Sequence, residues 1–136
     1  MAETLTLDIV TPHGHIFTEE VDEVLAPGSE GEFGVLPDHS PFLTTLKIGI
    51  LSYKKGSETG YFFINWGYAE VGPDKVTILA DSAEKSDEID PERAKEALKR
   101  AEERLKQATN VDEARATSAV ARATARIGLV DTHVPR

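Results

Sequence analysis

The six residues 89–94, which read IDPERA, divide this chain into two parts with different periodicity. Before them, short apolar runs alternate with turns rich in glycine and proline, and after them apolar residues recur at steps of three and four. Asp90 is a good N-cap, because a carboxylate accepts hydrogen bonds from the free backbone N–H groups of a first helical turn. Pro91 suits the next position, where a missing N–H costs little. The stretch therefore predicts a helix that begins at Pro91.

The charge of the chain changes at the same place. Residues 1–89 carry 16 acidic residues and 5 lysines, a charge of −11, whereas residues 90–136 carry 8 acidic and 10 basic residues, a charge of +2. The acidic part argues against nucleic-acid binding, which needs a basic surface. A solvated acidic surface explains most of this bias. The confinement of every arginine to positions after 92 requires a separate reason.

Composition and spacing exclude several classes of site. The chain has no cysteine, which excludes disulfides, thiolate metal sites and cysteine nucleophiles. No cationic leader precedes an apolar run, and no run approaches about 20 apolar residues, so we expect a soluble protein of the cytoplasm. His13 and His15 can share a strand face, but no third ligand is indicated, and we expect no metal site. No nucleophile lies in a recognisable pattern with a base, so we expect no catalytic residue.

The first part of the chain predicts a β-sandwich. Residues 3–10 alternate, with Leu5, Leu7 and Ile9 on one face, which is typical of a half-buried strand. Further short runs bounded by turns follow at the spacing of a sandwich or flattened barrel. We therefore expect a domain of short antiparallel strands at residues 1–86.

The glycine-rich stretch 28–41, GSEGEFGVLPDHSP, holds three acidic residues and no lysine. It lacks the Gly-Lys-Ser/Thr ending of a phosphate-binding loop. A structured loop between strands is therefore favoured over a small-molecule site.

The second part, residues 87–136, predicts an antiparallel hairpin of two helices, so the whole chain is α+β in sequence order. We expect the helices at about 91–107 and 113–127, with Asp112 as the second N-cap and Gly128 as the C-terminal stop. The connection expected at Thr109-Asn110 is short, as in helical hairpins. Large apolar side chains are few, and the docked state of the hairpin should be marginal. A marginally stable element is a candidate switch.

The second helix carries an arginine face. At about 100° per residue, Arg115, Arg122 and Arg126 point the same way, whereas the packing stripe lies elsewhere. That stripe is expected to hold Ala116, Val120, Ala123 and Ile127. No acidic residue follows Glu113 within the predicted helix, so the arginines have no partner of their own. Glutamates of the first helix, solvent and a foreign anion all remain possible partners.

Three of these stretches together resemble the ε subunit family of bacterial and chloroplast F-type ATP synthases. They are the GSEGEFGVLPDHSP stretch, the AEVGPDKVTILAD stretch at 69–81 and the IDPERA helix start, in this order and spacing. The resemblance covers essentially the whole chain. It implies a β-sandwich followed by a helical hairpin, and a non-catalytic subunit of the central stalk. The chain departs from the family at Trp66, where a small residue is expected.

The resemblance also implies partners. The γ subunit and the membrane c-ring are the expected partners of the sandwich, with residues Ser29, Glu30, Gly31, Glu32 and His39 at that rotor interface. In its extended form the hairpin would reach the catalytic α/β ring and inhibit ATP hydrolysis. The protein would then lie at the cytoplasmic face of the bacterial inner membrane, which it touches only through the complex.

The family's ATP-sensing members imply a nucleotide site in the folded hairpin. No cofactor is required, but ATP is a possible regulatory ligand. Arginines can hold phosphates, and a carboxylate can accept from ribose or adenine. An alternative, based on the arginine face alone, is a free-standing ATP-binding sensor or adaptor. The matching positions are Glu84, Ile89, Asp90, Arg93, Ala94, Arg100, Arg122 and Arg126.

Overall fold

The computed structural model describes residues 3–107 and 110–133, with the side chains of 3–107 and 113–130. The chain divides into two compact units, Met1–Glu84 and Lys85–Arg136. The boundary lies two residues before the one expected from the sequence. The connection expected at Thr109-Asn110 falls partly outside the described residues.

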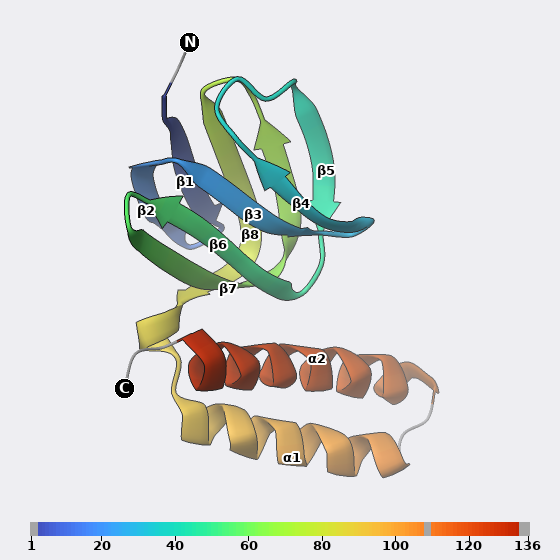
Figure 1. Ribbon diagram of the computed structural model, residues 1–136. Helices are drawn as coiled ribbons and strands as arrows, with labels where there is room; N and C mark the ends of the chain where they lie inside the picture. The colour runs from blue at the N-terminus through green and yellow to red at the C-terminus, as the bar shows by residue number, and fades with distance from the viewer. Residues whose placement is uncertain (1–2, 108–109, 134–136) are drawn as a thin grey trace. The chain divides into compact units, whose positions relative to one another are not determined.

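The first unit is a β-sandwich built from one sheet of eight strands, which folds over on itself (Figure 1). Along the main path the strand order is β2-β1-β8-β7-β5-β3-β4, and β6 pairs with both β3 and β7. The predicted fold class is confirmed. The strands are β1 (Leu5–Thr11), β2 (Gly14–Val21), β3 (Glu23–Gly28), β4 (Gly31–Val35), β5 (Phe42–Leu46), β6 (Gly49–Lys55), β7 (Glu58–Val71) and β8 (Lys75–Lys85).

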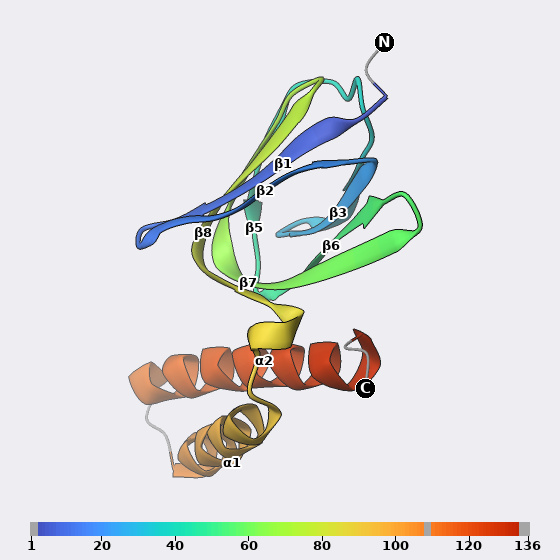
Figure 2. The same cartoon turned by 90° about the vertical axis from the view of Figure 1, so that its left-hand side faces the viewer.

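One strand pair is parallel, although the sequence predicted only antiparallel strands. β1 pairs antiparallel with β2 and parallel with β8, with Ile9 opposite Ile78. Figure 2 shows β1 and β8 side by side. Parallel neighbours need a long crossover connection, and here the rest of the sandwich supplies it. The first and last strands of the unit are thereby joined.

The core of the sandwich lies between the two layers. β1 alternates strictly, with Leu5, Leu7 and Ile9 almost fully buried, as the sequence predicted. Phe17 packs edge-on against Phe62, with ring centroids 4.9 Å apart. Aromatic pairs in this geometry add to the free energy of burial. The other buried members of the core include Val21, Val24, Ala26, Val35, Leu46, Leu51, Ile64, Ala69, Val71, Val76, Ile78 and Ala80.

Residues 28–41 are not a simple loop. They contain β4, which pairs antiparallel with β3, so Gly28 lies opposite Gly31 and Val24 opposite Val35. β3 also continues through Pro27 to Gly28. The apolar alternation of β4 is short and interrupted by glycine, so the sequence pattern did not predict this strand.

The second unit is an antiparallel helical hairpin. It begins with a single 3₁₀ turn, η1 (Ser86–Glu88), followed by α1 (Pro91–Gln107) and α2 (Asn110–His133). Figure 1 shows α1 and α2 side by side with opposite chain directions. Ala94 and Ala101 on α1 and Ala116 and Ala123 on α2 are buried, and each pair is two turns apart. Small side chains on both helices allow their backbones to approach closely.

α2 is longer than the predicted range 113–127. Because it begins at Asn110, Asp112 lies inside the helix and is not its N-cap; the Asp112 side chain is outside the described part. Gly128 does not end the helix, because its φ is not among the positive values that a left-handed stop requires. Leu129 is buried beyond it, so an apolar position after the glycine favours continued packing. Of the predicted stripe, Ala116 and Ala123 are buried, whereas Val120 and Ile127 are half-buried.

Candidate functional site

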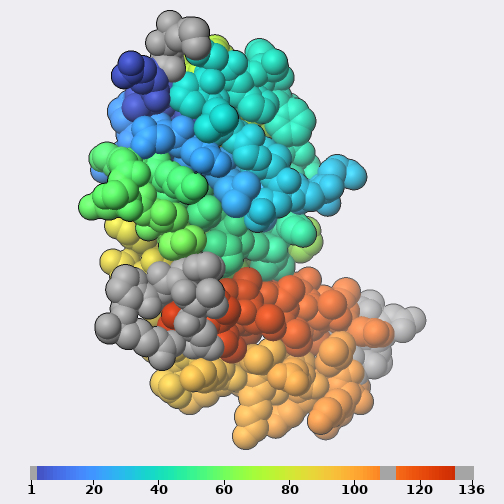
Figure 3. All heavy atoms as spheres, viewed as in Figure 1, coloured from blue at the N-terminus to red at the C-terminus, as the bar shows by residue number. Residues whose placement is uncertain are grey.

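The acidic turn between β3 and β4 groups four of the five residues expected at a rotor interface. Ser29, Glu30, Gly31 and Glu32 are consecutive and exposed, and Figure 3 shows this turn as a light-blue projection from the sandwich. A Cβ on Gly28 would come within 2.6 Å of the Gly31 carbonyl oxygen, so the tight turn requires glycine there. The turn is therefore held in shape by the backbone.

Two backbone hydrogen bonds and one side-chain hydrogen bond tie this turn to β5 and the residue that follows it. Ser29 N–H donates to the Thr45 carbonyl at 2.9 Å, and Thr45 Oγ1 donates to Ser29 Oγ at 2.7 Å. Lys47 N–H donates to the Pro27 carbonyl at 3.0 Å. Within the described residues, the carboxylates of Glu30 and Glu32 make no hydrogen bond or ion pair, and both residues are solvent-exposed.

His39 lies in the segment between β4 and β5, apart from the turn itself. Its Nδ1 donates to the Ser40 carbonyl at 2.6 Å, and its ring lies 6.4 Å from that of Phe42. Phe42 in turn packs edge-on on Phe33, the residue after Glu32, at 5.4 Å. Two successive ring contacts, one tilted and one edge-on, thus connect His39 to the strand that carries Glu32.

An apolar hollow in the sandwich was not predicted from the sequence. Its volume is about 710 Å³, and among the described residues that line it Asp81 is the only charged one. Trp66 forms part of the wall, is 50% exposed and has φ 60, in the left-handed region. This conformation is unfavourable for a bulky residue and explains why a small residue is expected at position 66. The lining comprises Val10, Thr11, Pro12, Ser29, Thr45, Leu46, Trp66, Gly67, Tyr68, Leu79, Ala80 and Asp81.

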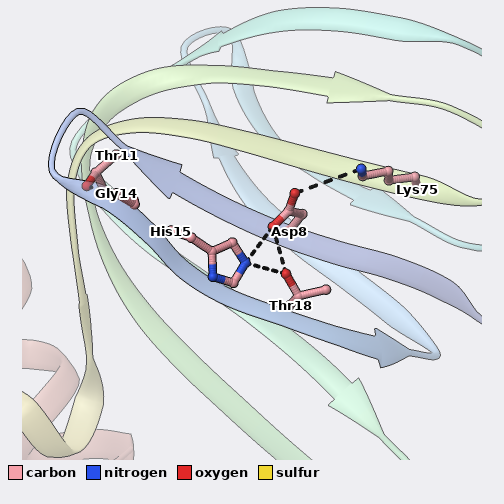
Figure 4. Close-up of polar contacts among 6 residues, drawn as sticks. All are labelled: Asp8, Thr11, Gly14, His15, Thr18 and Lys75. Carbon is pink, nitrogen blue, oxygen red and sulfur yellow. Dashed lines mark hydrogen bonds and ion pairs between the residues drawn. The ribbon is translucent and has the colours of Figure 1, made fainter.

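The outer face of β1 and β2 carries a polar cluster around Asp8 (Figure 4). His15 Nε2 donates to Asp8 Oδ1 at 3.0 Å, and Thr18 Oγ1 donates to the same oxygen at 2.8 Å. Lys75 Nζ lies 3.8 Å from Asp8 Oδ2. His15 is thus engaged by neighbours on its own sheet.

Glu20 lies on the same face and accepts two hydrogen bonds. Thr6 Oγ1 donates to it at 2.5 Å and Thr4 Oγ1 at 2.9 Å. The bond from Thr6, followed by that from Thr4, lowers the pKa of the Glu20 carboxyl. Both bonds favour the ionised form, because the oxygens of a carboxylate accept hydrogen bonds more strongly than those of the protonated acid.

The start of α1 confirms the predicted N-cap. Asp90 Oδ1 accepts from the backbone N–H groups of Glu92 at 3.0 Å and Arg93 at 3.1 Å. Ile89 and Ala94 are buried on either side of the cap, whereas the Arg93 side chain is exposed. One oxygen of Asp90 is therefore already occupied by the helix.

Three of the remaining predicted nucleotide residues are spread along the hairpin, and the fourth lies in the first unit. Arg100 is exposed on α1, and Arg122 and Arg126 are half-buried on α2. In an antiparallel hairpin the start of α1 lies level with the second half of α2, which brings Arg93 to the same half as Arg126. Glu84 belongs to β8 in the first unit.

A second hollow lies within the hairpin, with a volume of about 870 Å³. Of the predicted nucleotide residues only Arg122 lines it. The sequence analysis did not single out Arg104, and it placed Arg115 on the arginine face of the second helix without assigning it to a site. That arginine face was the signal in the sequence that pointed to this part of the hairpin. The lining comprises Arg104, Gln107, Ala114, Arg115, Ala116, Ser118, Ala119 and Arg122.

Two negative findings apply to the part of the chain that the structure describes. No helix there has the length and apolar character needed to cross a membrane. Within the same residues, no group of three or more His, Asp or Glu side chains is arranged to hold a metal ion.

Comparison with protein families matches both units. Residues 4–86 match the β-sandwich domain of the ATP synthase Delta/Epsilon chain, and residues 87–130 match the long α-helix domain of the same chain. Fold and sequence together thus define the class of ATP synthase delta/epsilon chains.

Curated relatives identify which kind of delta/epsilon chain this is. The ATP synthase epsilon chain of Geotalea daltonii is 62% identical over 106 residues, covering 78% of this chain and 77% of the relative. Epsilon chain 2 of Syntrophotalea carbinolica is 54% identical over 112 residues, covering 82% and 81%. The chain belongs to the ε subunit family of ATP synthase, as the resemblance of its motifs indicated.

Solved structures share the fold. A chain of the Euglena gracilis mitochondrial ATP synthase OSCP/F1/c-ring structure has a TM-score of 0.83 at 24% identity, covering 91% of this chain and 79% of that chain. A chain of the Tetrahymena thermophila mitochondrial central stalk/c-ring structure has a TM-score of 0.62 at 15% identity, covering 93% and 96%.

Proposed function

We propose that this chain is a non-catalytic subunit of the central stalk, which links γ to the c-ring and restrains ATP hydrolysis through its helical hairpin. The relatives are ATP synthase epsilon chains, and the Tetrahymena structure is described as central stalk/c-ring. The protein would be peripheral, at the cytoplasmic face of the bacterial inner membrane. It needs no cofactor of its own.

The acidic β3–β4 turn is the surface we assign to the rotor. It is exposed, it is rigidly shaped by Gly28 and the Ser29–Thr45 bonds, and it presents Glu30 and Glu32 together. An exposed carboxylate pair on a fixed turn suits a partner loop that carries basic or amide groups. Glu32 is assigned to the contact with the c-ring, and His39 to the neighbourhood of the contact between γ and the c-ring.

The packing of the hairpin is the observation that carries the regulatory part. Four of the buried residues, Ala94, Ala101, Ala116 and Ala123, are small, and Leu105 is 38% exposed; the large buried side chains Leu129 and Val130 lie near the end of α2. Burial of alanine contributes little, so the two helices are held together by few large apolar contacts. Such an element can exchange between arrangements when a partner offers a better surface.

Removal of residues 88–136 from the assembled complex tests this function. If the hairpin restrains hydrolysis, the truncated complex should hydrolyse ATP several-fold faster than the intact complex while the sandwich still assembles. An unchanged rate, with assembly verified, would refute the inhibitory role and leave the structural role standing.

ATP is proposed as the regulatory ligand of the folded hairpin. Arg93, Arg100, Arg122 and Arg126 supply cationic groups, and the free oxygen of Asp90 is available to accept from the sugar or base. A ligand that binds only the folded form stabilises it by about 2.7 kcal/mol at a hundredfold excess over Kd.

A further inference from the structure

The apolar hollow of the sandwich lies almost entirely outside the proposed function, which uses only Ser29 among its lining residues. Its volume of about 710 Å³ falls within the usual range of about 300–1,000 Å³ for small-molecule sites. Its walls come from β1, β5, β7 and β8 and from the turns after β1 and β3. The hollow therefore exists only in the folded sandwich.

Three large side chains at this hollow are open to solvent. Trp66 is 50% exposed, Tyr68 is 56% exposed and Leu79 is 47% exposed. Trp66 and Tyr68 are two residues apart on β7, and both line the hollow. Among the described residues, neither of their rings packs against another aromatic ring. Exposed apolar surface gathered around one hollow is typical of a binding site.

The backbone of Trp66 has a conformation that lowers stability. Its φ is 60, in the left-handed region, which is unfavourable for a residue with a bulky side chain. Glycine at this position would adopt the same φ without that cost. The next residue, Gly67, approaches the Leu79 carbonyl group so closely that a Cβ would overlap it, and this contact fixes the backbone here. An unfavourable aromatic residue at the wall of a hollow favours a role in binding over a role in folding.

The hollow carries a single negative charge. Of the described residues in its lining, Asp81 is the only charged one. Asn65 Nδ2 donates to Asp81 Oδ2 at 3.4 Å, whereas Asp81 Oδ1 takes no hydrogen bond or ion pair from any described residue. Asn65 Oδ1 is buried and likewise has no partner within that part of the chain. This pair of side chains thus offers unpaired acceptors, which suit a ligand that donates.

We propose that this hollow binds a small organic ammonium compound, with its apolar body against Trp66 and Leu79 and its charged nitrogen at Asp81. An ammonium group donates a charge-assisted hydrogen bond to a carboxylate, and cations are attracted to the faces of indole and phenol rings. Asp81 would repel an anionic ligand, and a neutral ligand would displace water from the carboxylate without replacing its hydrogen bonds. The charge of the hollow therefore selects the class of ligand.

Trp66 is the only tryptophan of the chain, so its fluorescence reports binding at the hollow directly. The full-length protein is titrated with phenylbutylammonium, phenylbutanol and phenylbutyrate, which share one apolar body and carry a positive, no and a negative charge. We expect saturable binding of the ammonium compound, at least tenfold tighter than that of the alcohol. The carboxylate should show no saturable binding.

Asp81→Asn tests the charge of the hollow. It should weaken the binding of phenylbutylammonium at least tenfold and leave that of phenylbutanol within twofold of the wild type. Asp74→Asn is the matched control, because it removes the same charge from an exposed position between β7 and β8, outside the lining of the hollow. Its affinity for phenylbutylammonium should stay within twofold of the wild type.

Trp66→Gly separates binding from folding. Calorimetry should show at least tenfold weaker binding of phenylbutylammonium. The unfolding temperature should equal that of the wild type or exceed it, because glycine takes the left-handed conformation without strain. A residue with a structural role alone would lose stability together with binding, and that result would count against the proposal.

The absence of saturable phenylbutylammonium binding at millimolar concentration would overturn the proposal. Equal affinities for the ammonium compound and the alcohol, or an equal loss in Asp74→Asn, would also overturn it. A wild-type dimer in analytical ultracentrifugation that Trp66→Gly dissociates would assign the hollow to a second copy instead. If Asp81→Asn unfolds, amide chemical shifts of the wild type decide: phenylbutylammonium should shift Gly67 and Ala80, and shifts confined to other residues reject the site.

Discussion

The carboxylate oxygen Oδ1 of Asp90 accepts a hydrogen bond from the backbone N–H of Arg93, at 3.1 Å. The same oxygen also accepts from Glu92 N–H at 3.0 Å. Two of the N–H groups that have no partner within the helix are thereby satisfied by one side chain. Asp90 thus has a structural role that is independent of any ligand.

Replacement of this cap should weaken the hairpin. Asp90→Ala removes both hydrogen bonds and should destabilise α1 by about 1 kcal/mol. Asp90→Asn retains an oxygen acceptor and should lose much less. Urea unfolding followed by helical circular dichroism compares the variants with the wild type. Equal stabilities of the alanine variant and the wild type would show that the cap is dispensable.

ATP should stabilise the hairpin through the Arg93 side chain. Because only the backbone of Arg93 makes the capping bond, Arg93→Ala changes the cation and leaves the cap in place. We expect ATP to raise the unfolding temperature of the wild-type hairpin and to have little effect on Arg93→Ala. Lys95→Ala, which alters a neighbouring exposed cation, serves as the control. A response of Arg93→Ala equal to that of the wild type would remove this residue from the site.

Gly67 should not tolerate a side chain. Its φ is 149, and a Cβ there would overlap the carbonyl group of Leu79 in the neighbouring strand. Gly67→Ala should therefore destabilise the sandwich by about 1–3 kcal/mol, the usual cost of overpacking. Gly34→Ala is the matched control, because its Cβ would find ordinary contacts, such as Leu25 Cδ1 at 3.8 Å. Chemical unfolding of both variants measures the difference, and equal stabilities would contradict the assignment.

Ile64 should report on the sandwich core. Its side chain is fully buried within the main cluster. Ile64→Val removes one methylene group and should cost about 0.5–1.5 kcal/mol. Leu43→Ala, at a position that is 71% exposed, should change the unfolding free energy much less. Guanidinium unfolding followed by Trp66 fluorescence provides the measurement. A larger loss of unfolding free energy in Leu43→Ala than in Ile64→Val would contradict the assignment of Ile64 to the core.

The pKa of the Glu20 carboxyl should lie below the ordinary value for glutamate. Since its folded pKa is lowered, its contribution to stability is present above the pKa of the unfolded chain and is lost as the pH falls through the folded pKa. Thr6→Val removes the larger cause and should raise the pKa of Glu20 toward 4.5. Thr4→Val should raise it less. Carboxyl-carbon NMR titration measures both, and an unchanged pKa in Thr6→Val would exclude this bond as the cause.

Local signals explain why much of the fold was predictable. The helix start depends on Asp90 and Pro91, which are adjacent in sequence, and the alternation of β1 is complete within seven residues. The end of α2 was predicted wrongly for the opposite reason. A glycine ends a helix when its backbone adopts the left-handed conformation, which Gly128 does not do. The burial of Leu129 immediately after it favours continuation of the helix.

The candidate sites also differ in whether neighbouring residues of the sequence are enough to locate them. The acidic turn from Ser29 to Glu32 could be located from its motif, because its residues are consecutive. The two hollows could not, since each requires residues from several elements. Arg104 and Arg115 line one hollow only in the folded hairpin, because they come from different helices.

The sequence by itself determined the family, the order of sandwich and hairpin, and the capped start of α1, because all three depend on short motifs and local periodicity. Only the tertiary structure decided the parallel pairing of β1 with β8, the left-handed conformation of Trp66 and the arginine-lined hollow of the hairpin. These features depend on which distant segments meet, and that outcome follows from packing of the whole unit.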